Sequence, residues 1–324
     1  MSARHFLDID DLTAPELDWV LALSVDPKPE QVLAGHGVAL YFEQPSNRTR
    51  NSTELAVVEL GGHPVVLRDD EVGVDTREPA EDVARVLACY HRVICLRMLE
   101  HAKLVRMAKA LDDAGMDVPV VNLLSSRAHP CQALADVLTL RDALAPGDSR
   151  TTALAGRSIA YIGDANNTCR SLAKAVLAAG MELRLANPAD HGFPADELAE
   201  LEGLAEGAGR GGSLVAAESP AAAAEGADAL YADVWTSMGG ENGSAARKEA
   251  FAGFTIDAAL LERAAPGAVV LHCLPAHRGE EITDDVLDGP QSAVWQQVRH
   301  RRTAMRGLLA WLVAVGGPEA ERGA

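Results

Sequence analysis

The sequence has 324 residues, which exceeds the usual ceiling for one hydrophobic core, so two domains are expected. Hydrophobic residues make up 48% and charged residues 23%, a globular composition. The formal net charge of -18 argues against a nucleic-acid or anionic-membrane surface, so an anionic substrate would need a local basic pocket.

The sequence shows no clear signal for secretion, membrane insertion or cysteine-based cross-linking. The N-terminus has no apolar signal core, and the longest apolar run, 308–315, is too short to span a bilayer, so a cytoplasmic location is expected. The five cysteines are odd in number and form no C-x-x-C pair. The sequence therefore predicts neither a disulfide framework nor a structural zinc site.

The first half of the chain alternates predicted strands and helices. Apolar runs predict strands at 38–42, 64–67, 93–97 and 118–123. Helical periodicity predicts helices at 10–22, 54–60, 79–90, 101–114 and 130–144. This alternation implies an α/β fold with a parallel sheet covered by helices on both faces.

The strongest linker signal is 145–152, Ala-Pro-Gly-Asp-Ser-Arg-Thr-Thr, and we place a domain boundary there. Strands are then predicted at 158–162, 182–186, 213–217, 229–234 and 268–272. The connection 235–253 is long, Gly-rich and charged, as binding loops often are. The last predicted helix, 291–315, has an apolar end that must be buried.

Polar residues after predicted strands are informative because ligands bind at the carboxyl ends of parallel strands. The segment 46–50, Ser-Asn-Arg-Thr-Arg, offers a helix cap at Ser46 or Asn47, hydroxyl groups and two guanidinium groups, as a phosphate dianion requires. Alone it is equally compatible with a solvated turn. Comparable groups occur at Arg97, 129–132, 163–167, 233–239 and 272–281, whereas no G-x-G-x-x-G marks a dinucleotide site.

Four of these segments, in order, resemble motifs of the ornithine carbamoyltransferase family. SNRTR resembles its Ser-Thr-Arg-Thr-Arg phosphate loop, HPCQ its His-Pro-x-Gln, DVWTSMG its Asp-x-x-x-Ser-Met-Gly, and HCLP its His-Cys-Leu-Pro signature. The similarity runs from about Arg4 to the C-terminal helix. Each residue alone has an ordinary explanation, such as a turn, a cap or core packing, but their joint occurrence favours the family.

The resemblance implies two doubly wound parallel-sheet domains. Residues 1–147 would bind carbamoyl phosphate, residues 148–299 would bind ornithine, and a C-terminal helix, about 300–324, would return to the first domain. The implied reaction transfers the carbamoyl group of carbamoyl phosphate to the side-chain amine of L-ornithine, giving L-citrulline and phosphate, in arginine biosynthesis. No metal or organic cofactor is implied, and the expected assembly is a homotrimer or a multiple of trimers.

The same resemblance assigns the site residues. Those expected to bind carbamoyl phosphate are Ser46, Asn47, Arg48, Thr49, Arg97, His129, Gln132 and Arg301. Those expected to bind ornithine are Asn167, Asp233, Ser237, Met238, Cys273 and Leu274. Four of these are also the expected catalytic residues: Cys273, Asp233, His129 and Arg97. By contrast, His272, His277, Arg278 and Glu281 are expected only to shape their loop.

The chain departs from the family pattern in its first domain. Asn47 stands where Thr is usual, and Gly73 stands near the Gln of a Gln-x-Gly segment that many members extend towards a neighbouring subunit. Two alternative functions stay open at this point. One is carbamoyl transfer to another amine, such as aspartate or putrescine, and the other is anion binding without catalysis.

Overall fold

The computed structural model describes residues 3–148, 150–235 and 244–315. The chain divides into two compact units. Unit 1 comprises Met1–Ala135 together with His300–Ala324, and unit 2 comprises Asp136–Arg299. Site residues Ser237 and Met238, predicted above, lie outside the described residues.

Unit 1 is built on a four-stranded parallel sheet of order β2-β1-β3-β4. The strands are β1 (Gly37–Phe42), β2 (His63–Arg68), β3 (His91–Arg97) and β4 (Val120–Leu124). The helices are η1 (Ile9–Asp11), α1 (Ala14–Ser24), α2 (Asn47–Glu59), α3 (Asp69–Val72), α4 (Ala80–Ala88) and α5 (His101–Asp113). The predicted alternation of strand and helix is confirmed.

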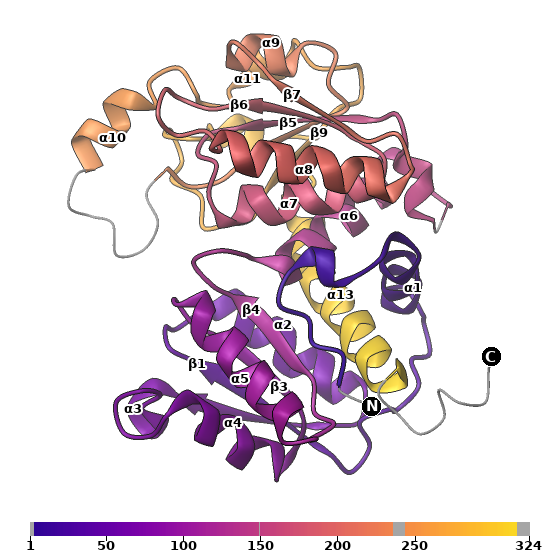
Figure 1. The fold of residues 1–324 in the computed structure, drawn as a ribbon. Helices are drawn as coiled ribbons and strands as arrows, with labels where there is room; N and C mark the ends of the chain where they lie inside the picture. The colour runs from indigo at the N-terminus through magenta and orange to yellow at the C-terminus, as the bar shows by residue number, and fades with distance from the viewer. Residues whose placement is uncertain (1–2, 149, 236–243, 316–324) are drawn as a thin grey trace. The chain divides into compact units, whose positions relative to one another are not determined.

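Both faces of the unit 1 sheet are buried at the inner strand β1. Ala39 and Tyr41 of β1 belong to a core cluster with α4 and α5. Val38 and Leu40 point to the opposite face, because successive side chains alternate along a strand, and both are fully buried. Figure 1 shows α4 and α5 on one side of this sheet and α2 on the other.

Unit 2 contains a five-stranded parallel sheet of order β7-β6-β5-β8-β9. The strands are β5 (Ser158–Ile162), β6 (Glu182–Ala186), β7 (Ser213–Ala216), β8 (Ala229–Ala232) and β9 (Val269–His272). The helices are η2 (Thr151–Leu154), α7 (Asn167–Ala178), α8 (Ala195–Ala208), α9 (Pro220–Ala224), α10 (Ser244–Ala250), α11 (Ala258–Leu261) and α12 (Asp284–Leu287). Helices α7 and α8 cover one face, and α9 and α11 cover the other (Figure 1). The predicted fold class, two parallel-sheet α/β domains, is confirmed.

Two helices contribute to both units. Helix α6 (Pro130–Leu144) passes from unit 1 to unit 2 after Ala135, and α13 (Val294–Val315) passes from unit 2 to unit 1 after Arg299. The predicted boundary lies further on, at 147/148. The difference arises because Asp136, in the middle of α6, already contacts Tyr231 and Gln297 of unit 2.

Local sequence explains where several elements begin. The Thr13 side chain accepts from the Glu16 N–H, and the Glu16 carboxylate accepts from the Thr13 N–H. This capping box starts α1 at Ala14, four residues after the predicted start. The long connection predicted at 235–253 contains one helix, α10, in its described part. No helix in the described ranges has the length and apolar character needed to cross a membrane.

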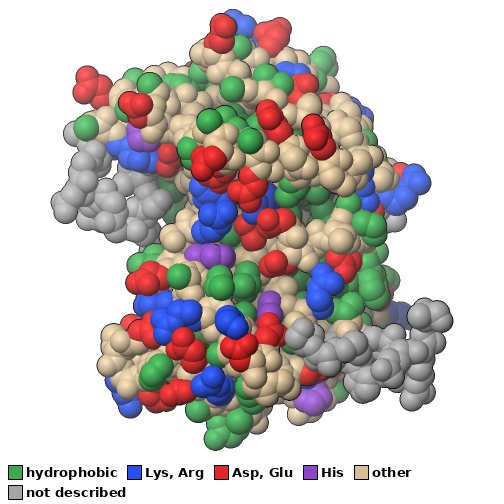
Figure 2. Space-filling model, viewed as in Figure 1, with side chains coloured by type: hydrophobic (Ala, Val, Ile, Leu, Met, Phe, Trp, Pro, Cys, Tyr) green, Lys and Arg blue, Asp and Glu red, His purple; other side chains and the backbone are tan. Residues whose placement is uncertain are grey.

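Charged side chains of both signs are interspersed on the face shown in Figure 2. Many of them pair on the surface, as Arg106 does with Asp75 and Glu81 at 2.8 and 2.7 Å. Pairs as exposed as these contribute little to the free energy of unfolding. We therefore attribute the stability of each unit mainly to its apolar core.

Helices α1 and α13 approach closely in unit 1 at Gly307. A Cβ atom at this position would overlap the Ser24 hydroxyl and the Val20 carbonyl oxygen. Since the helix is otherwise well packed, with Leu308 and Trp311 fully buried, glycine is required here for space.

We predict that Gly307→Ala lowers the free energy of unfolding by about 1–3 kcal/mol, the usual cost of overpacking, although alanine is the better helix former. The matched control is Gly203→Ala on α8, where a Cβ would have no heavy atom within 4 Å. That variant should gain about 0.5–1 kcal/mol. Denaturant unfolding of both variants checks this, and equal effects would contradict the packing account.

Candidate functional site

The first turn of α2 lies directly after β1, at the carboxyl edge of the unit 1 sheet. Ser46 is its N-cap, and the hydroxyl accepts a hydrogen bond from the Thr49 N–H at 3.3 Å. The Asn47 side chain is engaged with Asn51, which donates to its Oδ1 at 2.9 Å. A helix N-terminus carries partial positive charge and free N–H groups, so this turn is suited to an anion.

Three arginines meet near this turn, and we call Arg48, Arg97 and Arg301 the cationic cluster. They come from α2, the end of β3 and α13. Burial lowers the pKa of Arg97 to about 10, and the charges of Arg301 and Arg48 add to the effect. Its Nε is buried and has no hydrogen-bond partner among the described residues. A cation in this environment would be stabilised by an incoming anion.

Arg301 is held by neutral groups of unit 1. Its guanidinium donates to the side-chain oxygen of Gln132 and to the Thr49 hydroxyl, the latter at 3.3 Å. All three side chains are buried. The structure thus brings Arg301 of the C-terminal helix to the same place as Thr49 and Gln132, as the resemblance implied.

His129 immediately precedes α6 and lies beside the cationic cluster. Its carbonyl accepts from the Gln132 N–H at 3.0 Å, and Pro130 occupies the first helical position. Burial lowers the pKa of His129 well below its ordinary value, and the positive charges of Arg301, Arg97 and Arg48 lower it further. The imidazole is therefore neutral at pH 7 and can serve as a hydrogen-bonding group.

Buried polar contacts fix the loop that presents His129. The Ser125 N–H donates to the Ala128 carbonyl at 2.8 Å, and the Ala128 N–H donates back to the Ser125 hydroxyl at 3.2 Å. The amide of Asn122, at 0% exposure, donates to the same hydroxyl. The loop after β4 is thus held in one shape by its own hydrogen bonds.

A cavity of about 800 Å³ lies next to the first turn of α2. It borders Ser46 and Asn47 but extends towards Arg50, Arg68 and Asp69, and its lining does not include Arg97, His129 or Arg301. We therefore locate the candidate anion site by the cationic cluster and not by this cavity.

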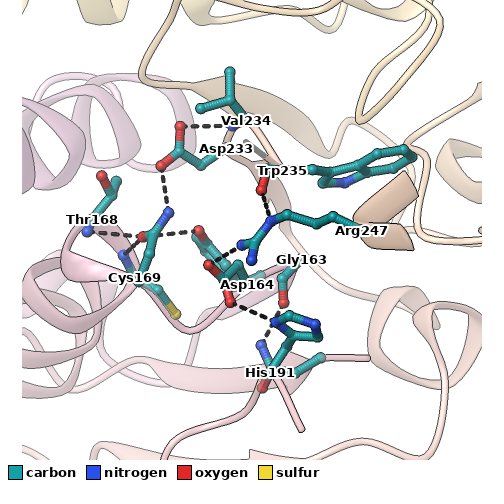
Figure 3. Close-up of polar contacts among 12 residues, drawn as sticks. Gly163, Asp164, Thr168, Cys169, His191, Asp233, Val234, Trp235 and Arg247 are labelled. Atoms are coloured by element: carbon teal, nitrogen blue, oxygen red, sulfur yellow. Dashed lines mark hydrogen bonds and ion pairs between the residues drawn. The ribbon is translucent and has the colours of Figure 1, made fainter. Parts of the chain in front are cut away.

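The second group of candidate residues lies at the carboxyl edge of the unit 2 sheet, and we call Asn166, Asp233 and Cys273 the Asp233 cluster. The Cys273 thiol donates to Asp233 Oδ1 at 2.8 Å, and the Asn166 amide donates to Asp233 Oδ2 at 2.8 Å. The Val234 N–H also donates to Oδ1, as Figure 3 shows. These donors hold the carboxylate in one orientation.

A buried polar network supports the Asp233 cluster from within unit 2. Gln297 accepts from the His272 N–H at 3.0 Å and donates to Asp136 at 2.7 Å. Asp136 also accepts from the Tyr231 hydroxyl at 3.1 Å, and the Tyr231 ring stacks on Tyr161. Since His272 immediately precedes Cys273, this network fixes the end of β9 from which the thiol projects.

The loop after β9 is shaped by His272 and Glu281, as predicted. Both side chains are fully buried, and the imidazole contacts the carboxylate at 3.1 Å. The other ring nitrogen accepts from the Leu274 N–H at 2.8 Å. Leu274 has a φ of 57°, a left-handed conformation that is unusual for leucine and needs such support.

Among the described residues, potential ligand atoms of His277, Glu280 and Glu281 lie within 4.8 Å of one another. Glu280 is already paired with Lys248 at 2.6 Å, and Glu281 accepts from the His277 N–H at 2.6 Å. These contacts explain the grouping as a loop structure, so we assign no metal to it.

The structure groups most of the predicted residues into two sets. In unit 1, the carboxyl edge of the sheet collects Ser46, Asn47, Arg48, Thr49, Arg97, His129, Gln132 and Arg301. In unit 2, Asn167 begins α7, but the residue that contacts Asp233 is its neighbour Asn166. Sequence reasoning missed Asn166, although its place as the cap of α7 was a usable signal.

Comparison with known proteins decides the family. A model described as "Aspartate/ornithine carbamoyltransferase, carbamoyl-P binding domain" matches residues 4–142. The companion "Asp/Orn binding domain" matches residues 155–312. The chain belongs to the aspartate/ornithine carbamoyltransferase family. The two matches leave residues 143–154 between them, and this interval contains the whole predicted linker, 145–152.

Relatives within this family are similar over nearly their whole length. A protein from Acidothermus cellulolyticus named ornithine carbamoyltransferase is 46% identical, over 97% of this chain and 98% of the relative. One of the same name from Sorangium cellulosum is 41% identical, over 97% and 99%. The solved ornithine carbamoyltransferase of Pyrococcus furiosus is 35% identical, with a TM-score of 0.85 over 95% of this chain and 96% of that chain.

We predict that Arg97→Met removes most of the stabilisation that inorganic phosphate confers. Phosphate at a hundred times its Kd should raise the wild-type free energy of unfolding by about 2.7 kcal/mol. Without phosphate the variant should be about 1 kcal/mol more stable, because a buried cation near two others has been removed. The control is Arg85→Met, whose exposed side chain pairs with Asp82. Full phosphate stabilisation in Arg97→Met would contradict this assignment.

The lowered pKa of His129 predicts a pH effect on stability. Below about pH 6.5 the unfolded chain gains a proton on this residue that the folded chain does not. The free energy of unfolding therefore decreases as the pH is lowered, by up to about 1.4 kcal/mol per pH unit. His129→Gln should show a shallower loss between pH 7 and 5 than wild type. The exposed His36→Gln serves as control, and parallel pH curves for wild type and His129→Gln would refute the prediction.

Proposed function

We propose that this protein is an ornithine carbamoyltransferase, which transfers the carbamoyl group of carbamoyl phosphate to the side-chain amine of L-ornithine. The curated relatives reported above carry this name consistently. The observation that carries the proposal is the cationic cluster around a neutral His129, because it matches the dianion and the carbonyl of one small substrate.

The carbamoyl-phosphate half of the reaction is assigned to unit 1. The phosphate would bind at the first turn of α2, on Ser46, Asn47, Arg48 and Thr49, with the guanidinium groups of Arg97 and Arg301. His129 would hydrogen-bond the carbamoyl oxygen, where negative charge grows as the amine attacks. Gln132, whose side-chain oxygen accepts from Arg301, would also accept from the carbamoyl NH2 group.

The ornithine half is assigned to unit 2. Asp233 and Cys273 would orient the side-chain amine and favour its neutral, nucleophilic form. The Leu274 carbonyl would contribute to the same amine, and Asn167, Ser237 and Met238 would hold the α-amino and α-carboxylate groups. Asn166 joins this set because it fixes one oxygen of Asp233.

The chemistry balances without any added reactant. The amine nitrogen forms a bond to the carbamoyl carbon, and the negative charge passes to the carbonyl oxygen. The bond from carbon to the phosphate oxygen then breaks and the carbonyl re-forms. The proton that the nitrogen loses leaves with the phosphate, which departs as HPO4²⁻. Preorganised donors at the carbonyl oxygen and cations at the leaving phosphate lower the barrier to both steps.

We further propose that the protein acts as a homotrimer, or a multiple of trimers, in the cytoplasm and supplies citrulline for arginine synthesis. The family resemblance supports these features. Sedimentation equilibrium tests the assembly, and a monomer at micromolar concentration would overturn that part of the proposal.

The function itself is tested by incubating the protein with carbamoyl phosphate and, separately, ornithine, aspartate or putrescine, and measuring the ureido product. We expect citrulline with ornithine and little product with the other amines. Turnover confined to another amine would overturn the ornithine assignment, and phosphate binding without any turnover would overturn catalysis.

We predict that His129→Ala lowers kcat by about a hundredfold or more, the usual cost of losing one donor to a developing oxyanion. The exposed His36→Ala should stay within twofold of wild type. Citrulline formation at saturating concentrations of both substrates measures the effect. Near-normal turnover of His129→Ala would remove His129 from the catalytic residues.

A further inference from the structure

Arg247 of α10 ties together two loops of unit 2 that carry the Asp233 cluster. Its Nε donates to the Trp235 carbonyl oxygen, and its Nη2 donates to the Asp164 carboxylate. The guanidinium also lies over the Phe251 ring, 5.0 Å from the ring centroid. Figure 3 shows Arg247 between Trp235 on one side and Asp164 on the other.

Each of the two residues that Arg247 holds lies two residues from a member of the Asp233 cluster. Asp164 lies two residues before Asn166 in the loop after β5, and Trp235 lies two residues after Asp233 in the loop after β8. Strands β5 and β8 are neighbours in the sheet. Arg247 therefore joins the two loops close to the point where the Asn166 amide donates to the Asp233 carboxylate.

The loop after β5 is also held from its other side. The His191 ring contacts Asp164 at 3.4 Å, and the Ala165 N–H donates to the His191 carbonyl at 2.9 Å. The His191 ring packs on Phe251 at 4.8 Å between centroids. Asp164 thus lies between an imidazole and a guanidinium, both of which pack on the same phenyl ring.

Charge explains why an arginine is needed at this junction. The Trp235 carbonyl and the Asp164 carboxylate are both acceptors, so each requires a donor when partly buried. The guanidinium fork supplies two separate N–H groups in a fixed plane, which a lysine ammonium cannot reproduce. The guanidinium of Arg247 donates to the Trp235 carbonyl and to the Asp164 carboxylate, so its effect on Asp233 and Cys273 would pass through the two loops.

We propose that Arg247 is a positioning residue for the amino-acid half of the reaction, an inference that rests on the proposed function. It sets the distance between the loops after β5 and β8, and so keeps Asn166 in contact with Asp233. Asp233 in turn holds the Cys273 thiol at 2.8 Å. Loss of Arg247 should weaken ornithine use selectively, because the carbamoyl-phosphate residues belong to unit 1.

Steady-state kinetics of Arg247→Gln and Arg247→Lys test this role. We expect Arg247→Gln to raise the KM for ornithine about tenfold and to lower kcat, with the KM for carbamoyl phosphate within twofold of wild type. Arg247→Lys should rescue part of the loss, since it keeps the charge but not the fork. Thermal unfolding and circular dichroism would establish that both variants are folded.

The matched control is Lys248→Gln, which removes the same charge from the next residue of α10. The Lys248 side chain is 52% exposed and pairs with Glu280. This control should keep all kinetic constants within twofold of wild type. A rise in ornithine KM equal to that of Arg247→Gln would show that the charge of α10, and not the Arg247 contacts, is responsible.

A double variant tests whether the effect passes through Asp164. Asp164→Asn alone should also raise the KM for ornithine. The double variant should change the free energy derived from kcat/KM by less than the sum of the two single changes, because both remove the same contact. Full additivity of the two changes would contradict the proposed route.

The inference fails if Arg247→Gln keeps kcat and the KM for ornithine within twofold of wild type. It also fails if the KM values for ornithine and carbamoyl phosphate rise equally and the melting temperature falls. The second result would mark a general structural role. Wild-type protein that makes no citrulline would overturn the proposed function and this inference together. Wild-type activity with an unaffected Arg247→Gln would overturn this inference alone.

Discussion

Repulsion among the three guanidinium groups of the cationic cluster is the constraint on which unit 1 depends. Arg48, Arg97 and Arg301 are more than two hundred residues apart at the extremes, yet they lower the pKa of the same imidazole. Such a grouping is unfavourable without an anion, so packing must hold it. The buried apolar residues of α13 serve this purpose by fixing the helix that carries Arg301.

The cationic cluster also reconciles two properties of the chain that otherwise conflict. A net charge of -18 repels anions at a distance, whereas the proposed substrate is itself an anion. Local guanidinium groups in a partly buried place outweigh distant charges that are screened by salt. Burial, reinforced by the same positive charges, lowers the pKa of His129, so the imidazole is a hydrogen-bonding group and not a fourth cation.

Unit 2 applies a different principle to its candidate residues. Here a single carboxylate, Asp233, is surrounded by donors that come from different loops, and the orientation of the thiol depends on all of them. The buried contacts behind the sheet, through Gln297 and Asp136, support the same strand ends. The geometry of the Asp233 cluster is therefore maintained by hydrogen bonds to one carboxylate, in contrast to the grouped like charges of unit 1.

Much of this arrangement could be predicted from local sequence. Apolar runs located the strands that end beside the candidate residues. The sequence predicted a helix cap at Ser46 or Asn47, and the cap is Ser46. Arg301 could not be chosen from the run 299–302 by charge alone, and only the family resemblance singled it out. The contacts of Asp136 with Tyr231 and Gln297 span 95 and 161 residues, and no local pattern carries such information. Asn166 and Arg247 were missed for a related reason, since their roles depend on which loops the sheet brings together.

A crystal structure of the protein with carbamoyl phosphate bound is the most direct test of the central claim that the cationic cluster holds the substrate phosphate. We predict phosphate oxygens within hydrogen-bond distance of the first turn of α2, with Arg97 Nε and the Arg301 guanidinium among their partners. The carbamoyl group should face His129 and Gln132. Phosphate bound elsewhere on the chain, with Arg97 Nε still lacking a partner, would contradict the account.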